Sequence, residues 1–223
     1  MQNSLLRPKG RVALFIDGVN FYHTLRELQL HVDYRRLLSY VSEDAWLVKA
    51  TYYTTLLQSQ SPEWLVRLTD WLAYNNYHVI TKPARYVRRH AIDEEGNEYW
   101  VNEIKGDTDI EITVDMMNLA HHCDTLYLFS GDEAFVYLVK AVQKLNTRVI
   151  VVSSEIPEFS RVDNDLRRQA DEFIDITMIT QHICMIFCNL RSLRRPCGVK
   201  CYDKVFRFGR FQTKGYPVNL LLW

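Results

Sequence analysis

The sequence predicts an α/β fold built on a central, mostly parallel sheet of about five strands. The first observation is a set of short, mostly apolar runs, such as 11–17 and 124–132, that lack polar alternation. Runs of this kind are typical of strands buried on both faces. The second observation is their order, because they alternate with helical patterns of about 10–15 residues. Strands in that order pair in parallel, and the helices between them cover both faces of the sheet.

Several elements are expected in the first half of the chain. In order they are a strand at 11–17, a helix from Asn20, a short helix at 32–41, a strand at 44–53, a helix at 63–75 and a strand at 77–83. The helical spacing of Leu37, Leu38 and Val41 indicates the short helix, and aromatic and β-branched residues mark the second strand. Ser61 is expected as the N-cap of the third helix, with Pro62 as its first residue.

The second half of the chain repeats this alternation. In order we expect a helix beginning near Thr108, a strand at 124–132, a helix at 133–145, a strand at 148–152, a short helix at 164–170 and a strand-like end at 173–176. Ile110, Val114 and Met117 recur at the spacing of one helical face. Phe135 and Leu138 do the same in the next helix, which supports the alternating pattern.

Residues 85–102 interrupt the alternation and predict a hairpin. Its first arm contains Arg85, Arg88 and Arg89, and its second arm is rich in aromatic residues. Arginines contact phosphates and aromatic rings stack on bases. The three arginines, together with Lys105 after the second arm, are therefore predicted to bind RNA. The alternative is an ordinary polar hairpin.

Three carboxylates are expected to meet at one edge of the sheet. Asp17 and Asp132 end two of the buried strands, and Asp109 begins the helix that precedes the second of them. Parallel strands all end at one edge, so these side chains can converge. Neighbouring carboxylates repel one another unless a cation neutralises them, and oxygen ligands suit Mg²⁺ or Mn²⁺. This predicts metal-dependent phosphodiester hydrolysis. The alternatives are that Asp17 only caps the following helix and that Asp109 is only an acid in the first turn of a helix, where the positive end of the helix dipole stabilises it.

Four motifs occur in an order that resembles a known family. They are Phe15-Ile-Asp17-Gly-Val-Asn20, Lys105-Gly-Asp-Thr-Asp109 followed by Val114-Asp-Met116, Ser130-Gly-Asp132-Glu-Ala-Phe135 and Leu166-Arg-Arg-Gln-Ala-Asp171-Glu-Phe-Ile. Over about residues 11–176 they resemble the NYN domain of the LabA-like branch, in the PIN-like nuclease superfamily. The resemblance implies a PIN-like three-layer α/β/α fold and metal-dependent ribonuclease activity.

The resemblance also implies roles for individual residues. Asp17, Asp109 and Asp132 would hold the metal, and Asn20 would orient the metal or the phosphate. These four are the predicted catalytic residues. The lysine-glycine motif carries one extra residue before Asp109, which leaves Asp107 as an alternative ligand.

One position departs from the family pattern. Ala134 stands where the family has a second acid, two residues after Asp132. This loss would weaken metal binding or mark a member that binds RNA without cutting it. Asp115 and Asp171 also match family positions. Asp115 points about 120° away from Asp109 on the helix, so we interpret Asp115 as structural.

The composition is that of an ordinary soluble protein, with 48% hydrophobic and 24% charged residues. No apolar run approaches the ~20 residues that span a bilayer. The N-terminal extension, residues 1–10, lacks the apolar core of a signal peptide. We therefore expect a cytoplasmic protein that does not bind membranes. The sequence leaves open whether it forms a homodimer.

Residues 177–223 are expected to form a basic tail. They contain eight Lys and Arg against one acid, whereas residues 1–176 contain 19 basic and 26 acidic residues. Such asymmetry is typical of a nucleic-acid-binding tail or of a solvated, poorly folded end. Four cysteines fall here: Cys184, Cys188, Cys197 and Cys201. Their central loop is short for a zinc site, so unrelated reduced thiols are favoured over zinc.

The sequence therefore predicts a Mg²⁺- or Mn²⁺-dependent ribonuclease acting on RNA, with single strands as the expected substrate. The competing hypothesis is a catalytically weak regulator that binds RNA or a protein. Ala134 discriminates between the two. A phosphatase or another hydrolase using the same acidic residues is a third hypothesis, which no further motif supports.

Overall fold

The structure is a computed structural model that describes residues 10–57, 61–92, 96, 98–158 and 160–184. The chain divides into two compact units. The first comprises Met1–Val87 and Ile104–Met185, and the second comprises Arg88–Glu103 and Ile186–Trp223. The first unit contains both hydrophobic cores and all the acidic residues predicted to hold a metal.

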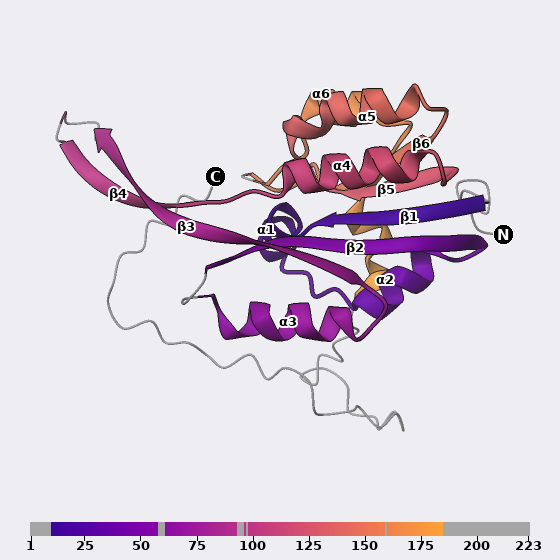
Figure 1. Cartoon of the computed structure of the whole chain (residues 1–223), viewed down its shortest axis with the longest axis horizontal. Coiled ribbons are helices and arrows are strands. Elements are labelled where there is room, and N and C mark those ends of the chain that lie inside the picture. Colours follow the sequence, from indigo (N-terminus) through magenta and orange to yellow (C-terminus); the bar gives the residue numbers. More distant parts are fainter. Residues whose placement is uncertain (1–9, 58–60, 93–95, 97, 159, 185–223) are drawn as a thin grey trace, which may run out of the picture. The chain divides into compact units, whose positions relative to one another are not determined.

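Strands and helices alternate along the chain (Figure 1). The strands are β1 (Gly10–Asp17), β2 (Ala45–Leu57), β3 (His78–Ile92), β4 (Glu98–Lys105), β5 (Thr125–Phe129), β6 (Arg148–Ser153) and β7 (Glu172–Asp175). The helices are α1 (Gly18–Glu27), α2 (Tyr34–Val41), α3 (Glu63–Ala73), α4 (Asp109–Ala120), α5 (Val136–Gln143), α6 (Asn164–Gln169) and α7 (Thr180–Ile183), with 3-10 turns η1 (Glu133–Phe135) and η2 (Ile176–Ile179). This order confirms the predicted α/β class.

The described strands form one sheet in the order β4-β3-β2-β1-β5-β6-β7. β1 is central and pairs in parallel with β2 and β5, and parallel pairing continues from β2 to β3 and from β5 through β6 to β7. The sheet is therefore mostly parallel, as predicted, but its seven strands exceed the predicted five. The two strands beyond those five, β4 and β7, lie at the edges, where they correspond to the second arm of the predicted hairpin and to the strand-like end predicted at 173–176. An edge strand mixes polar with apolar residues and lacks the continuous apolar run that reveals a central parallel strand.

Two hydrophobic cores lie on opposite faces of the sheet. Along β1, Val12, Leu14 and Ile16 pack into the core covered by α1, α2 and α3, whereas Ala13 and Phe15 pack into the core covered by α4, α5 and α6. All five side chains are buried. Figure 1 shows the two sets of helices on either side of the sheet. The three-layer α/β/α architecture is therefore confirmed.

The third helix begins differently from its prediction. Pro62 is the N-cap of α3 and no side chain caps the helix. The Ser61 hydroxyl instead donates a hydrogen bond to the Leu57 carbonyl at 2.9 Å. The prediction of Ser61 as N-cap is wrong because this hydroxyl turns back to the end of β2. The predicted helix at 63–75 ends two residues early, at Ala73, and Asn76 follows it with a φ of 65°.

The packed core continues past residue 176. Ile176, Ile179 and Ile183 of η2 and α7 are buried on the face that α1, α2 and α3 cover. Most of the predicted basic tail, with Cys188, Cys197 and Cys201, lies outside the described residues, as do residues 1–9 of the N-terminal extension. None of the helices within the described ranges is long and apolar enough to cross a bilayer.

Candidate active site

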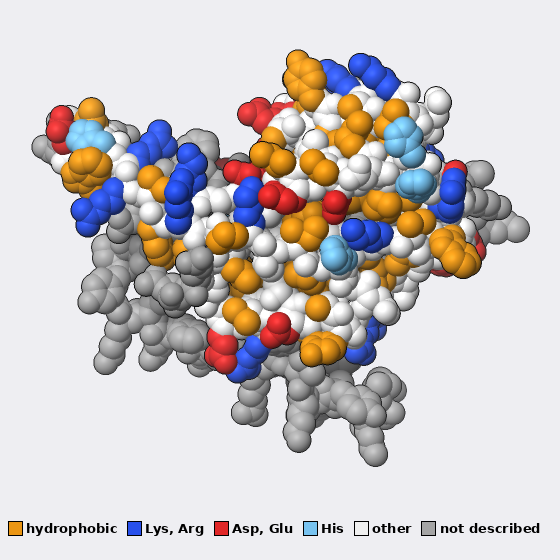
Figure 2. Space-filling view, in the orientation of Figure 1, with side chains coloured by type: hydrophobic (Ala, Val, Ile, Leu, Met, Phe, Trp, Pro, Cys, Tyr) orange, Lys and Arg blue, Asp and Glu red, His pale blue; other side chains and the backbone are white. Residues whose placement is uncertain are grey.

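Three aspartates lie at the edge where the parallel strands end, which we call the carboxyl edge. Asp17 is the last residue of β1, Asp132 follows β5 and caps η1, and Asp109 is the first residue of α4. β1 and β5 are neighbours in the sheet, so Asp17 and Asp132 follow adjacent strands. On the face seen in Figure 2, acidic side chains gather over the beginning of α4, with a basic side chain beside them.

The Asp17 side chain is held at both of its oxygens. Oδ1 accepts a hydrogen bond from the Asn20 backbone N–H at 3.2 Å, and Oδ2 accepts one from the Ser130 hydroxyl at 3.0 Å. Only 6% of the residue is exposed. Asp17 therefore caps α1, as the structural alternative predicts, and it is also a buried carboxylate held between two neighbouring strands.

Electrostatic repulsion couples the three carboxylates. Burial, together with the negative charges of Asp109 and Asp132, raises the pKa of Asp17 to about 6. Burial also raises the pKa of Asp109 to about 6, with repulsion from Asp132 and Asp107 acting in the same direction and Lys82 opposing it. Each pair among the three therefore repels, so their charges lie within range of one another. We call Asp17, Asp109 and Asp132 the acidic cluster.

Hydrogen bonds join the two strand ends that carry the cluster. The side-chain oxygen of Asn20 accepts from the Gly131 backbone N–H at 2.9 Å. The Ser130 hydroxyl donates to Asp17 and accepts from the Asp132 backbone N–H at 3.2 Å. Ser130 thus forms hydrogen bonds with two of the three aspartates, Asp17 and Asp132. The sequence prediction gave Ser130 no role, although a serine that ends an apolar strand two residues before an acid is a usable signal.

A cation from β3 lies beside the cluster. Lys82 Nζ is 3.1 Å from Glu111 Oε1 and 3.2 Å from Glu111 Oε2 on α4. Its charge lowers the pKa of Asp109 against the raising effects of the neighbouring acids. Sequence reasoning missed this pair. Its signal is a lysine near the end of the predicted strand at 77–83.

Two further acids from the motifs serve packing. Asp115 Oδ2 accepts a hydrogen bond from the Tyr53 hydroxyl at 2.8 Å and lies 3.7 Å from Lys49 Nζ, so it ties α4 to β2. Asp171 Oδ2 accepts from the Val149 backbone N–H at 2.8 Å, which fixes the beginning of β6. These contacts give both residues structural roles outside the acidic cluster.

The predicted RNA-binding residues are exposed. Arg85 on β3 and Lys105 at the end of β4 belong to the first unit. Arg88 and Arg89 belong to the second unit, where His90 also packs edge-on against Trp100 at 5.2 Å between ring centroids. Exposure on strands is compatible with contact to RNA phosphates, and the role of these residues stays a prediction.

The donor chemistry of the acidic cluster fits a hard divalent cation. No three His, Cys, Asp or Glu side chains in the part of the chain that the structure describes come close enough to form a metal site by themselves. The three carboxylates nevertheless repel one another, and one of them is almost fully buried. A divalent cation would relieve that repulsion, and oxygen ligands of this kind are those of Mg²⁺ and Mn²⁺.

Known proteins resemble this chain across the whole described sheet. The NYN domain family matches residues 11–178. Low amplitude and bright protein LabA of Synechococcus elongatus is 31% identical over 179 residues, which cover 79% of this chain and 89% of LabA. The crystal structure of a protein of unknown function, VPA0982 of Vibrio parahaemolyticus, matches with a TM-score of 0.60 and 25% identity, covering 83% of this chain and all of that one. The family match includes every member of the acidic cluster.

Proposed function

The chain belongs to the NYN domain family, in its LabA-like branch, and from this premise we propose that it is a ribonuclease that hydrolyses RNA phosphodiester bonds with Mg²⁺ or Mn²⁺. The family is of the PIN-like, nuclease type. The observation that carries the proposal is the acidic cluster, in which three carboxylates distant in sequence repel one another at the carboxyl edge. Such an arrangement is costly unless a cation or a proton neutralises it.

Asp17, Asp109 and Asp132 would hold the cation. When bound, it would promote ionisation of a water molecule and stabilise the charge that develops on the phosphate oxygens. Ser130 keeps the Asp17 carboxylate in one orientation. The hydrogen bond from the Gly131 backbone N–H keeps the side-chain oxygen of Asn20 directed at Gly131. The amide nitrogen of Asn20 then remains as a donor for a phosphate oxygen.

Basic residues supply the remaining contacts in this proposal. Arg85, Arg88, Arg89 and Lys105 would bind the RNA backbone, because guanidinium and ammonium groups pair with phosphates and position the strand without reading its sequence. The test is cleavage of an end-labelled single-stranded RNA in Mn²⁺, Mg²⁺ or EDTA. Cutting in either metal that stops in EDTA supports the proposal, and binding without cutting in any of these buffers contradicts it.

Metal binding is expected to stabilise the fold. A ligand that binds only the folded chain at 100 times its Kd adds about 2.7 kcal/mol to the free energy of unfolding. Mg²⁺ or Mn²⁺ should therefore raise the Tm by several degrees, and EDTA should reverse the shift. The measurement is thermal unfolding followed by circular dichroism, with Asp132→Asn as the variant in which the shift should shrink. An identical Tm with and without metal would count against a metal site in the cluster.

A second candidate function is a regulator that binds RNA or a protein without efficient cutting. Ala134 favours it, because this exposed residue stands where the family has an acid, and its backbone N–H donates to Asp132 Oδ1 at 2.9 Å. In this case the domain would bind RNA or a protein through its basic surface, and RNA cleavage at the acidic cluster would be weak.

Ala134→Asp is expected to lower the metal concentration needed for half-maximal cleavage by roughly 10-fold, since groups that orient metal ligands are typically worth 10- to 100-fold in affinity or activity. The measurement is the cleavage rate against Mn²⁺ concentration. Ala73→Asp is the matched control, because Ala73 is also exposed and ends α3 away from the carboxyl edge. Cleavage found only in Ala134→Asp, and absent from the natural chain, would favour the regulator.

A further inference from the structure

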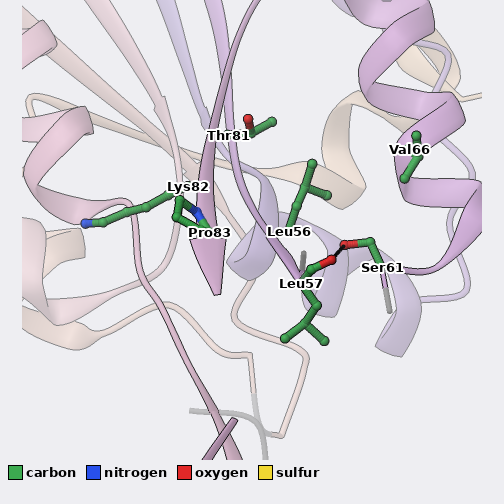
Figure 3. Close-up of a pocket in the computed structure, with 7 residues that line it drawn as sticks. All are labelled: Leu56, Leu57, Ser61, Val66, Thr81, Lys82 and Pro83. Atoms are coloured by element: carbon green, nitrogen blue, oxygen red, sulfur yellow. Dashed lines mark hydrogen bonds between the residues drawn. The ribbon is translucent and has the colours of Figure 1, made fainter. Parts of the chain in front are cut away.

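A groove of about 460 Å³ lies at the carboxyl edge on the face opposite α4. It is lined by six apolar and hydroxyl residues and by Lys82: Leu56, Leu57, Val66, Pro83, Ser61, Thr81 and Lys82 (Figure 3). β2 ends in Leu56 and Leu57, and α3 begins three residues before Val66, so the groove opens where these two elements meet. The members of the acidic cluster are not among its lining residues.

The alternation of β3 separates the groove from the acidic cluster. Thr81 and Pro83 point to the groove side, whereas the amino group of Lys82 points the other way in Figure 3 and pairs with Glu111 on α4. A single nucleic-acid strand that crosses the carboxyl edge would therefore meet carboxylates and a lysine on one face and an apolar groove on the other. Its phosphates would be attracted by Lys82 and by a cation on the carboxylates, whereas its bases need an apolar or aromatic surface.

The chemistry of the groove suits a planar heterocycle. Leu56, Val66 and Pro83 provide apolar walls for the two faces of a ring. Thr81 is exposed, and the Ser61 oxygen can still accept a hydrogen bond while its proton is directed to Leu57. The volume lies within the range of about 300–1,000 Å³ in which proteins bind small ligands.

A stacked aromatic pair lies on the other flank of the same helical turn. Trp64 on α3 stacks on Tyr22 of α1, with ring centroids 4.9 Å apart and an angle of 22° between the planes. Trp64 and Val66 are two residues apart, so they lie about 160° from each other around α3. The first turn of α3 is therefore bordered by the groove on one side and by aromatic rings on the other. Tyr22 is exposed, so its ring offers a surface on which an unpaired base can stack.

We infer that the groove between the first turn of α3 and the ends of β2 and β3 binds one unpaired nucleobase of the RNA strand whose phosphates lie at the acidic cluster. This rests on the proposed function, because it deepens the description of the substrate as single-stranded RNA. A base-paired strand has its bases stacked inside a helix and cannot insert one into the groove. The groove therefore selects single strands.

The test compares two probes and two matched variants in EDTA buffer, where no metal-dependent cutting occurs. The probes are a labelled oligouridylate and a ribose-phosphate oligomer of the same length that lacks bases. Val66→Glu places a charge in the groove. Val48→Glu is the control, because Val48 lies in the first half of β2, away from the groove at the end of that strand. The two positions are equally accessible, with Val66 40% and Val48 39% exposed.

The natural chain is expected to bind the oligouridylate roughly 5- to 150-fold more tightly than the baseless oligomer, which corresponds to one inserted base. Val48→Glu should keep this ratio and Val66→Glu should reduce it to about one. An unchanged ratio in Val66→Glu overturns the inference and leaves the proposed function standing. Equal binding of both probes by the natural chain also overturns the inference and leaves the proposed function standing. No binding of either probe overturns the inference, and the cleavage assay in Mn²⁺ or Mg²⁺ then decides the proposed function separately.

A second measurement needs no variant. An oligomer containing 4-thiouridine is irradiated with the natural chain, and the crosslinked peptides are identified by mass spectrometry. Crosslinks within residues 56–66 or 81–83 are expected. Crosslinks confined to other parts of the chain would overturn the inference while confirming that RNA binds.

Discussion

Asp17→Asn is expected to reduce metal-dependent RNA cleavage by at least about 10²- to 10³-fold, because preorganised groups that stabilise the transition state are typically worth that much each. The substitution removes one negative charge and keeps the shape of the side chain. An asparagine oxygen can still accept from the Asn20 N–H, and its amide can donate to the Ser130 oxygen in place of the present bond. The measurement is the cleavage rate of an end-labelled single-stranded RNA in Mn²⁺.

The same substitution is expected to stabilise the metal-free protein. The pKa of Asp17 is about 6 in the folded chain against its ordinary 3.8, so the ionised carboxylate is less favourable in the folded state. The cost is absent below pH 3.8, where the group is protonated in both states, and it is complete above pH 6. It amounts to about 3 kcal/mol. Asp17→Asn should therefore exceed the natural chain in free energy of unfolding at pH 8, and the difference should vanish near pH 4.

Asp124→Asn is the matched control for both measurements. Asp124 is exposed, precedes β5 at the opposite edge of the sheet and pairs with Arg11 at 3.6 Å. Its replacement should leave the cleavage rate unchanged and should not stabilise the chain at pH 8. Cleavage that survives in Asp17→Asn would locate the chemistry elsewhere. A loss of cleavage without any gain in stability would show that the buried charge of Asp17 is already neutralised without metal.

The predictable part of the fold is the part governed by burial on both faces. β1, β5 and β6 read as continuous apolar runs because helices cover both sides of a central parallel strand, and this left no other interpretation. β4 and β7 were predicted only as a hairpin arm and a strand-like end, because edge strands carry no such run. β3 reaches Ile92 and lies next to β4 in the sheet, so the two strands correspond to the hairpin predicted at residues 85–102.

The acidic cluster was predictable because topology alone brings the ends of parallel strands together. The contacts around it were not. Ser130 reaches Asp17 and Lys82 reaches Glu111 only after the register of neighbouring strands and the position of α4 are set. Side-chain partners of this kind depend on tertiary packing, so a sequence pattern can suggest the residues but not their pairing. The same holds for Tyr22 and Trp64, which meet from two helices.

Gly18→Ala is expected to destabilise the fold by about 3 kcal/mol, at the upper end of the usual cost of overpacking. A Cβ atom at Gly18 would lie 2.5 Å from the Tyr53 carbonyl oxygen and 2.6 Å from Cζ of Tyr52. Tyr52 cannot move away easily, because it is buried and its ring packs edge-on against Tyr34 at 5.9 Å. The measurement is denaturant unfolding at equilibrium.

Gly106→Ala is the control, since its Cβ would lie 3.1 Å from Ala84 and needs only a small adjustment. Equal stability losses in the two variants would mean that the contact at Gly18 is relieved by a shift of α1. The expected difference explains why a glycine follows Asp17. α1 begins directly at the end of β1 only because its first residue lies against β2 without a side chain. That close approach lets Asp17 cap α1 and places Asn20, three residues later, against Gly131, so the same glycine that permits the turn also assembles the candidate site.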